Sequence, residues 1–221
     1  MTNSYPQIAG QSVSRLEAIS DGIFAVAMTL LVLDLAIKGT TVPHGQHPLW
    51  TPGAFGSERE ALKELRGLAP KVVPYVMSFM TLGIFWVGQQ TQLNHLERAN
   101  RQLTYIHLTF LSAVTLMPFS TRFLSAYLTY RIPFLVYWLN LLLAGWLLFA
   151  SLVYAGRNGL FKAEATAEIR ASLRRRIYVY QSCYLVALSL SVINTYVSLG
   201  VFVAVQLIAI ISPPVRPFNR I

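Results

Sequence analysis

Residues 15–37 read RLEAISDGIFAVAMTLLVLDLAI, a stretch that is apolar through its middle and carries ionisable side chains near both ends. A helix of this length can cross the hydrocarbon core of a bilayer, which takes about 20 mainly apolar residues. Its acidic residues and the lack of a small-residue cleavage site indicate a retained membrane helix rather than a cleaved signal peptide. Ser14 and Glu17 have the spacing of a capping box, which predicts that the helix begins there.

The composition of the whole chain agrees with a membrane protein. Of its 221 residues 54% are hydrophobic and 12% are charged, whereas roughly 25% of the residues in an ordinary soluble domain are charged. These values exclude a soluble globule and a disordered chain. The net charge of +9 would suggest nucleic acid as the partner of a soluble protein. In a membrane protein it indicates connectors that face anionic lipid, so we expect membrane lipids and no nucleic acid as partners.

Five further apolar segments follow the first, separated by polar or basic connectors. We therefore predict an all-α, polytopic membrane protein with one transmembrane domain over residues 1–221. The six predicted spans are residues 19–37, 70–90, 104–128, 132–154, 177–197 and 199–211. A tight turn at Leu199 and Gly200 is predicted to separate the last two spans, although one long kinked helix would also fit the pattern.

The two long connectors differ in composition. Residues 38–69 are predicted to lie outside the cytoplasm and to hold one short amphipathic helix at the membrane surface. Residues 157–176 form a basic cytoplasmic connector that ends in three arginines, residues 174–176, which we interpret as a topogenic contact with lipid headgroups. Lys and Arg are more numerous on the side of the N-terminus, so we expect a multi-pass protein of the cell membrane with both termini in the cytoplasm.

The first span concentrates ionisable groups, which are costly at membrane depth and are therefore functional candidates. At about 100° per residue, four of its residues fall on one narrow stripe: Ile23, Ala27, Leu30 and Asp34. Apolar rings at mid-membrane can form a hydrophobic constriction, and an acidic residue at a pore mouth attracts cations. Ordinary packing between helices would explain the same stripe, with Asp34 at the headgroup boundary or paired with Lys38 one turn along.

Three motifs resemble, in the same order along the chain, those of the TMEM175 family of potassium channels. Residues 15–22, RLEAISDG, resemble the signature R-x-x-x-F-S-D-G, with Ile19 in place of the phenylalanine. Residues 83–86, GIFW, lie in the second predicted span, and residues 116–121, LMPFST, resemble the family pattern L-x-P-F-S-T in the third. With the six-span layout, the resemblance extends over nearly the whole chain.

The resemblance implies a potassium-permeable cation channel that assembles as a homotetramer, with one six-helix unit per chain and the first helices around a central pore. It also implies a pore without a carbonyl-lined filter, and this sequence has no T-V-G-Y-G stretch. Ile23 and Leu30 are then expected to form apolar rings of the constriction, with Ala27 between them and Asp34 at the pore mouth. Potassium is the permeant ion, and no cofactor, bound metal or catalytic residue is expected.

The resemblance further implies a polar network that holds the first helix against its neighbours. Its expected members are Arg15, Ser20, Asp21 and Gly22 of the signature. Trp86 and Gln89 of the second span are candidates to contact them, although an interfacial or core aromatic would explain Trp86 equally well. The family usually has a histidine three residues after Trp86, where this sequence has Gln89 and Gln90. Glutamine does not titrate near neutral pH, so we expect any pH sensitivity carried by that histidine to be missing.

Other polar side chains within or beside the predicted spans receive a structural interpretation. Asn140 and Asn194 are expected to form hydrogen bonds between helices. His95 and His107 are expected to be solvated or hydrogen-bonded rather than functional.

Two other classes of function are compatible with the sequence. A secondary transporter could use Asp21 or Asp34 as a proton or ion relay, although the spans show no clear internal repeat or pair of interrupted helices. A membrane scaffold without transport is the other. An enzyme is not expected, because the chain has no nucleophile elbow, P-loop or dinucleotide-binding motif.

Overall fold

The structure is a computed structural model that describes residues 12–35, 50–51 and 54–211. Within these ranges the regular elements are all helices, which confirms the predicted all-α class. In chain order they are α2 (Val13–Leu30), the 3-10 helix η1 (Leu31–Leu35), α3 (Ala54–Asn94), α4 (Arg101–Thr115), α5 (Met117–Ala126), α6 (Arg131–Arg157), α7 (Ala167–Leu190) and α8 (Thr195–Ile211).

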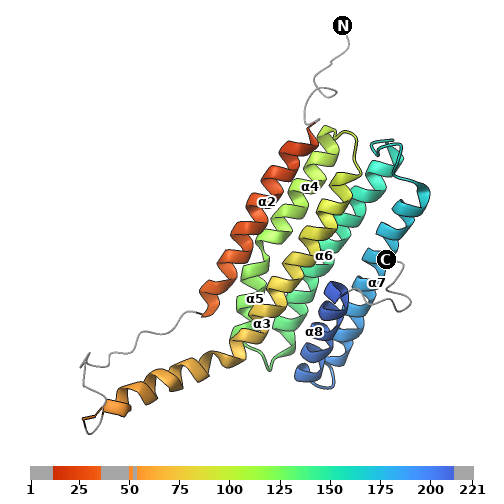
Figure 1. The fold of residues 1–221 in the computed structure, drawn as a ribbon. Coiled ribbons are helices and arrows are strands. Elements are labelled where there is room, and N and C mark those ends of the chain that lie inside the picture. The colour runs from red at the N-terminus through yellow and green to blue at the C-terminus, as the bar shows by residue number, and fades with distance from the viewer. Residues whose placement is uncertain (1–11, 36–49, 52–53, 212–221) are drawn as a thin grey trace.

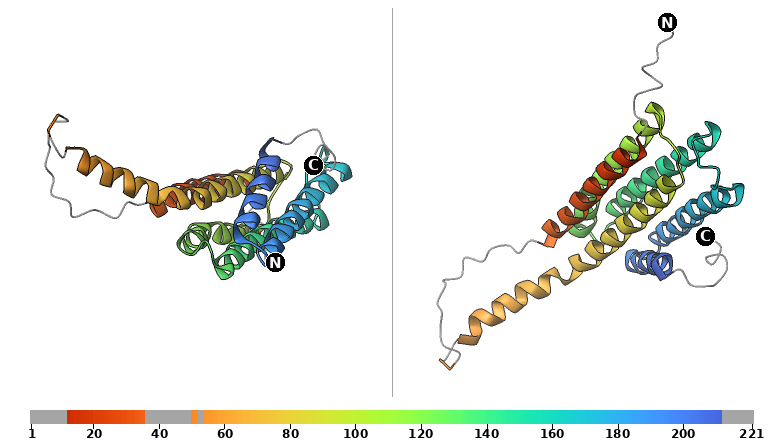
Figure 2. Two further views of the ribbon diagram at one scale, coloured as in Figure 1. Left: turned by 90° about the horizontal axis from the view of Figure 1, so that it is seen from below. Right: turned by 45° about the horizontal axis from the view of Figure 1, so that its top comes forward.

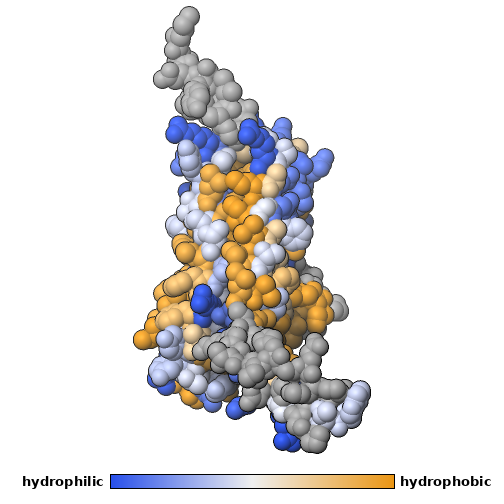
Figure 3. Space-filling model, turned by 90° about the vertical axis from the view of Figure 1, so that its left-hand side faces the viewer, coloured by the Kyte–Doolittle hydropathy of each residue, from blue (hydrophilic) through white to orange (hydrophobic). Residues whose placement is uncertain are grey.

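The helices form an elongated bundle (Figure 1). α2, α3, α4 and α6 run nearly side by side, and α7 and α8 pack on the side of the bundle away from α2, as Figure 2 also shows. Among the described residues, four segments are long and apolar enough to cross a membrane: Val13–Leu35, Ala61–Asn94, Arg101–Ala126 and Arg131–Arg157. α8 is a shorter apolar helix of 17 residues. Figure 3 shows an apolar band between polar ends on the side that carries α2.

α2 begins two residues earlier than the capping-box pattern predicts. The hydroxyl of Ser12 accepts a hydrogen bond from the backbone N–H of Arg15 at 3.3 Å, so Ser12 is the N-cap and the helix begins at Val13. The Ser14 hydroxyl lies 3.0 Å from that of Ser12. The predicted capping box of Ser14 and Glu17 is therefore wrong.

α3 is one helix of 41 residues that extends beyond the bundle (Figure 1). Residues 57–66 form the first part of this helix, so the separate surface helix predicted in the connector is wrong. Pro70 and Pro74 lie inside α3, and each lacks the N–H that would bond one turn back. The ribbon changes direction between its amber and yellow parts, the region of these two prolines. They separate the projecting part of α3 from the part that packs in the bundle.

α7 and α8 meet at a different place from the predicted turn. Residues 191–194 connect them, so Leu199 and Gly200 lie inside α8 and the tight turn predicted at these two residues is wrong. α8 folds back along α7 and packs against it. The Ser198 hydroxyl donates to the carbonyl oxygen of Ala187 at 2.6 Å across the two helices. This contact also excludes the alternative of one long kinked helix.

Asn194 explains the position of this turn. Its Oδ1 accepts the backbone N–H groups of Tyr196 at 2.8 Å and of Val197 at 3.4 Å. These are donors of the first turn of α8 that would otherwise lack a partner. Asn194 therefore caps α8, and the expectation that it bonds between two spans is wrong.

α4 and α5 form one interrupted helix, and Asn140 of α6 lies against the interruption. The break directly precedes Met117 and Pro118, within the LMPFST motif. Oriented so that both of its polar atoms have partners, the Asn140 amide donates to the Ala113 carbonyl oxygen at 2.9 Å and accepts from the Met117 N–H at 3.2 Å. The interhelical hydrogen bonds expected of Asn140 are confirmed.

Replacing Asn140 by Leu keeps the size of the side chain and leaves the Ala113 carbonyl and the Met117 N–H without this partner. We expect a lower melting temperature of the detergent-solubilised protein, equivalent to a loss of about 1–2 kcal/mol. The control is Asn94→Leu, at an exposed position at the end of α3. Equal melting temperatures of the two variants would contradict the role given to Asn140.

Candidate functional site

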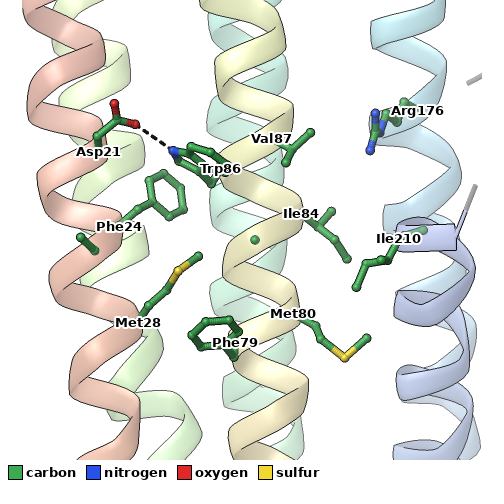
Figure 4. A pocket seen from close by; sticks show the side chains of 13 residues that line it. Asp21, Phe24, Met28, Phe79, Met80, Ile84, Trp86, Val87, Arg176 and Ile210 are labelled. Atoms are coloured by element: carbon green, nitrogen blue, oxygen red, sulfur yellow. Dashed lines mark hydrogen bonds between the residues drawn. The ribbon is translucent and has the colours of Figure 1, made fainter.

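Asp21 of α2 is hydrogen-bonded to two side chains of α3. Its Oδ1 accepts from the indole Nε1 of Trp86 at 2.8 Å and from the amide Nε2 of Gln90 at 2.7 Å. Figure 4 shows the first of these bonds between the two helices. Asp21 is exposed and Trp86 is 39% exposed, so the bonds join α2 and α3 at the surface of the single chain.

Ser20 lies on the opposite, buried side of the same turn of α2. Its hydroxyl donates to the carbonyl oxygen of Leu16 at 2.7 Å and accepts from Nε2 of Gln89 at 3.0 Å. The same Gln89 nitrogen lies 3.3 Å from Nδ1 of His107, which belongs to α4. All three side chains, Ser20, Gln89 and His107, are fully buried. One glutamine therefore connects α2, α3 and α4 inside the bundle.

The structure thus brings together four members of the expected network: Ser20, Asp21, Trp86 and Gln89. Gly22 lies beside them on the exposed face of α2, with open space around the position of a Cβ. The side chain of Arg15 is exposed and forms no hydrogen bond or ion pair with any other residue that the structure describes.

Two members of the network were not assigned to it from the sequence. Gln90 was noted only as a replacement for the family histidine, yet it binds Asp21 directly. His107 was expected to be solvated or hydrogen-bonded, and it is hydrogen-bonded within the network. The spacing of His107 could have indicated its burial. It falls one turn after Leu103 and one turn before Phe110 and Leu111, all of which are buried.

The predicted stripe of α2 lies at the border between the buried and the exposed face of the helix. Ala27 is 2% exposed and belongs to the core, whereas Leu30 is 44% exposed. Ile23 is partly buried and packs against the same core. The single chain therefore turns Ala27 inward and leaves Ile23 and Leu30 at the edge of the exposed face. The centre of that face consists of Ala18, Gly22, Val26 and Thr29, and the exposed Leu33 follows in η1.

Asp34 lies in η1, at the other end of this segment. Nζ of Lys71 on α3 donates to the Asp34 carbonyl oxygen at 3.4 Å. The carboxylate Oδ2 of Asp34 is buried without a hydrogen-bond partner among the described residues. Lys38, the partner considered from the sequence, lies outside those residues. Lys71 is thus a basic residue that the structure places beside Asp34.

A second buried polar cluster connects α3, α5, α6 and α8. Thr121 of the LMPFST motif donates to the Ser78 hydroxyl at 2.7 Å, and Ser78 donates to the Tyr137 hydroxyl at 3.3 Å. The Tyr137 hydroxyl also lies 3.1 Å from Oγ1 of Thr81, which accepts from Gln206. These five polar residues lie on four different helices, so no spacing within one helix indicates the cluster.

An apolar hollow of about 810 Å³ opens between α2, α3, α7 and α8 (Figure 4). Phe24 and Met28 of α2 and Met80 and Ile84 of α3 line it, with Asp21 and Arg176 near one end. Within the described residues, no group of three or more His, Cys, Asp or Glu is placed to hold a metal ion. The surroundings of the network thus offer contacts for apolar groups.

Comparison with known proteins gives consistent matches. Residues 15–118 match the family model described as the endosomal/lysosomal potassium channel TMEM175. A Chamaesiphon minutus protein named as a potassium channel is 31% identical over 202 residues, which cover 85% of this chain and 88% of that protein. A Streptomyces collinus protein with the same description is 35% identical over 114 residues, which cover 52% of this chain and about half, 48%, of that protein.

The fold also matches a solved structure. The crystal structure of a lysosomal potassium-selective channel TMEM175 homolog from Chamaesiphon minutus superposes with a TM-score of 0.71. The match covers 90% of this chain and 96% of that chain, at 23% sequence identity. The two chains therefore share their fold.

A double-mutant cycle tests the bond between α2 and α3. We expect Asp21→Ala and Trp86→Phe to be coupled by about 1 kcal/mol in the free energy of unfolding, because each variant removes one end of the same hydrogen bond. Trp146→Phe is the matched control, since Trp146 lies on α6 and is 61% exposed. A coupling that is equal for the two tryptophans would contradict the contact.

Proposed function

Because the chain belongs to the TMEM175 family, we propose that it is a potassium-permeable cation channel. The observation that carries this proposal is the 31% identity over 85% of the chain with a relative that is named as a potassium channel. The family is one of ion channels and not of enzymes. Four helices suited to crossing a membrane agree with a multi-pass protein.

The proposed channel is a homotetramer with α2 of each copy around a central pore. A single chain offers α2 contacts on one side only, and the other side exposes apolar residues such as Val26 at 57% and Leu33 at 66%. This face needs lipid or other copies of the chain to cover it. α7 and α8 would complete six spans in the cell membrane, with both termini in the cytoplasm beside the basic connector.

The proposed constriction consists of rings of Ile23 and Leu30, one of each per copy. Both lie at the edge of the exposed face of α2, from which a side chain can reach an axis outside the single chain. Ala27 would pack behind them in the core of each copy. A narrow apolar ring can restrict the passage of ions by excluding water. Asp34 would lie at the pore mouth, where a carboxylate raises the local concentration of potassium ions.

In this proposal the network around Asp21 positions the pore helix and does not carry ions. Asp21 Oδ1 accepts two hydrogen bonds from uncharged donors of α3, which is the arrangement of a structural contact. A proton- or ion-coupled transporter would instead need Asp21 or Asp34 to change partners during its cycle. The contacts of Asp21 therefore favour the channel over the transporter.

Potassium flux measures the proposed activity directly. We expect purified protein in liposomes to conduct potassium ions and to exclude chloride, with unitary currents in a planar bilayer. A saturable, proton-coupled flux without unitary currents would favour the transporter. Sealed liposomes without any flux would favour the scaffold.

The constriction is tested by two separate variants, each of which places an amide side chain on α2, at positions one turn apart. We expect Ile23→Asn to raise conductance or weaken selectivity with little loss of stability, because a polar ring holds water more easily than an apolar one. Ala27→Asn should instead lower the melting temperature, by about 1–3 kcal/mol in free energy, because it buries an amide in the core. A changed current in Ala27→Asn at unchanged stability would reverse the assignment.

A further inference from the structure

A second hollow, of about 340 Å³, lies where α6 ends and α7 begins. Its rim carries three arginines: Arg157 from the last turn of α6, and Arg170 and Arg174 from the start of α7. Leu152, Val153 and Gly156 of α6 form its floor. None of the described residues that line it is acidic. The hollow therefore combines three guanidinium groups with an apolar base.

The connector from α6 to α7 is held in place by backbone hydrogen bonds. Leu160 accepts the N–H of Glu97 at 2.9 Å, and Lys162 donates its N–H to the carbonyl oxygen of His95 at 2.9 Å. Gly159 turns the chain with a φ of +61°, a conformation that favours glycine. These contacts fix the connector, which links the end of α6 to the start of α7, against the residues between α3 and α4.

Arg170 is held by a further contact. Its guanidinium carbon lies 5.8 Å from the ring centroid of Phe161, a buried residue of the connector. Arg174 follows one turn later, at a spacing at which like charges on a helix repel each other. An anion bound between these groups would remove this repulsion, and the planar guanidinium fork suits the oxygens of a phosphate.

The surface next to the hollow is apolar on the side of the membrane-spanning segments. Phe149 lies one turn from Val153 on α6, and Tyr178 lies one turn from Arg174 on α7. The centroids of these two rings are 5.0 Å apart. Tyr178 is 56% exposed. A ligand that reaches from the arginines over this aromatic pair needs a phosphate at one end and a hydrocarbon chain at the other. A phospholipid meets both requirements, whereas free phosphate meets only the first.

We propose that the hollow of Arg157, Arg170 and Arg174 binds the headgroup phosphate of an anionic membrane phospholipid, whose acyl chain runs over Phe149 and Tyr178. The site is separate from the pore helix, and it goes beyond the general attraction of basic connectors to anionic lipid because two helices and an apolar floor define its position. Bound lipid would join the ends of α6 and α7.

Native mass spectrometry and melting temperature test this site without measuring ion flux. We expect phosphatidylglycerol, added to the detergent-solubilised protein, to remain bound and to raise the melting temperature, while phosphatidylcholine does so much less. The double variant Arg170→Gln, Arg174→Gln should lose most of both effects. Arg98→Gln, Arg101→Gln is the matched control, because it removes the same charge at the same end of the bundle and should retain them.

Four results would overturn the proposal. Equal losses in the two double variants would indicate diffuse attraction rather than a site. Equal stabilisation by inorganic phosphate alone would assign the hollow to a free anion, and equal stabilisation by phosphatidylcholine would remove the role of the arginines. Should the first double variant fold poorly, Arg170→Lys, Arg174→Lys keeps the charge and loses the fork, and unchanged lipid retention there would equally contradict the phosphate geometry.

Discussion

The hydrogen bonds between one turn of α2 and the facing side of α3 determine the rotation of α2 about its own axis, and with it which side chains face out of the bundle. Asp21 is held from the exposed side by Trp86 and Gln90, and its neighbour Ser20 is held from the buried side by Gln89. Successive residues of a helix point about 100° apart, so two contacts on adjacent residues define its rotation. That rotation turns Ala27 into the core and Val26 and Leu33 outward.

The same type of contact recurs at other depths of the bundle. Tyr137 joins Ser78 and Thr81 of α3, and Asn140 bridges the interruption between α4 and α5. Lipid tails are as apolar as leucine, so burial of apolar surface contributes little to holding membrane helices together. Close packing and buried hydrogen bonds must do so instead. The two motifs of the second and third spans lie at hydrogen bonds between helices, at the surface for Trp86 and in the core for Thr121, which explains these residue types in structural terms.

The four segments of the described residues that are long and apolar enough to cross a membrane overlap the first four predicted spans, because apolar length is a property of each segment alone. The α7–α8 turn was misplaced because the prediction relied on Gly200, whereas Asn194 caps the following helix through its side chain. The continuous α3 was missed because residues 38–69 were treated as a connector that ends where the apolar span begins, whereas the structure continues one helix through Pro70 and Pro74.

The contacts between helices were predictable only in part. Asp21, Trp86 and Gln89 were expected in one network from the resemblance. In the structure Trp86 is hydrogen-bonded to Asp21, and Gln89 is hydrogen-bonded to Ser20. Ala27 was placed on the pore stripe from angles within a single helix. Which side of a stripe is buried depends on the neighbouring helices, and no spacing within α2 contains that information.

In the proposed channel, the exposed face of α2 packs against α2 of other copies of the chain, and together these helices surround the ion path. Single-particle imaging of the protein in lipid nanodiscs tests it most directly, because it shows symmetry and helix position together. We expect four copies, with α2 of each next to the four-fold axis and Leu30 nearer to that axis than Ala27. A monomer, or an oligomer in which α2 faces lipid and another helix surrounds the axis, would contradict it.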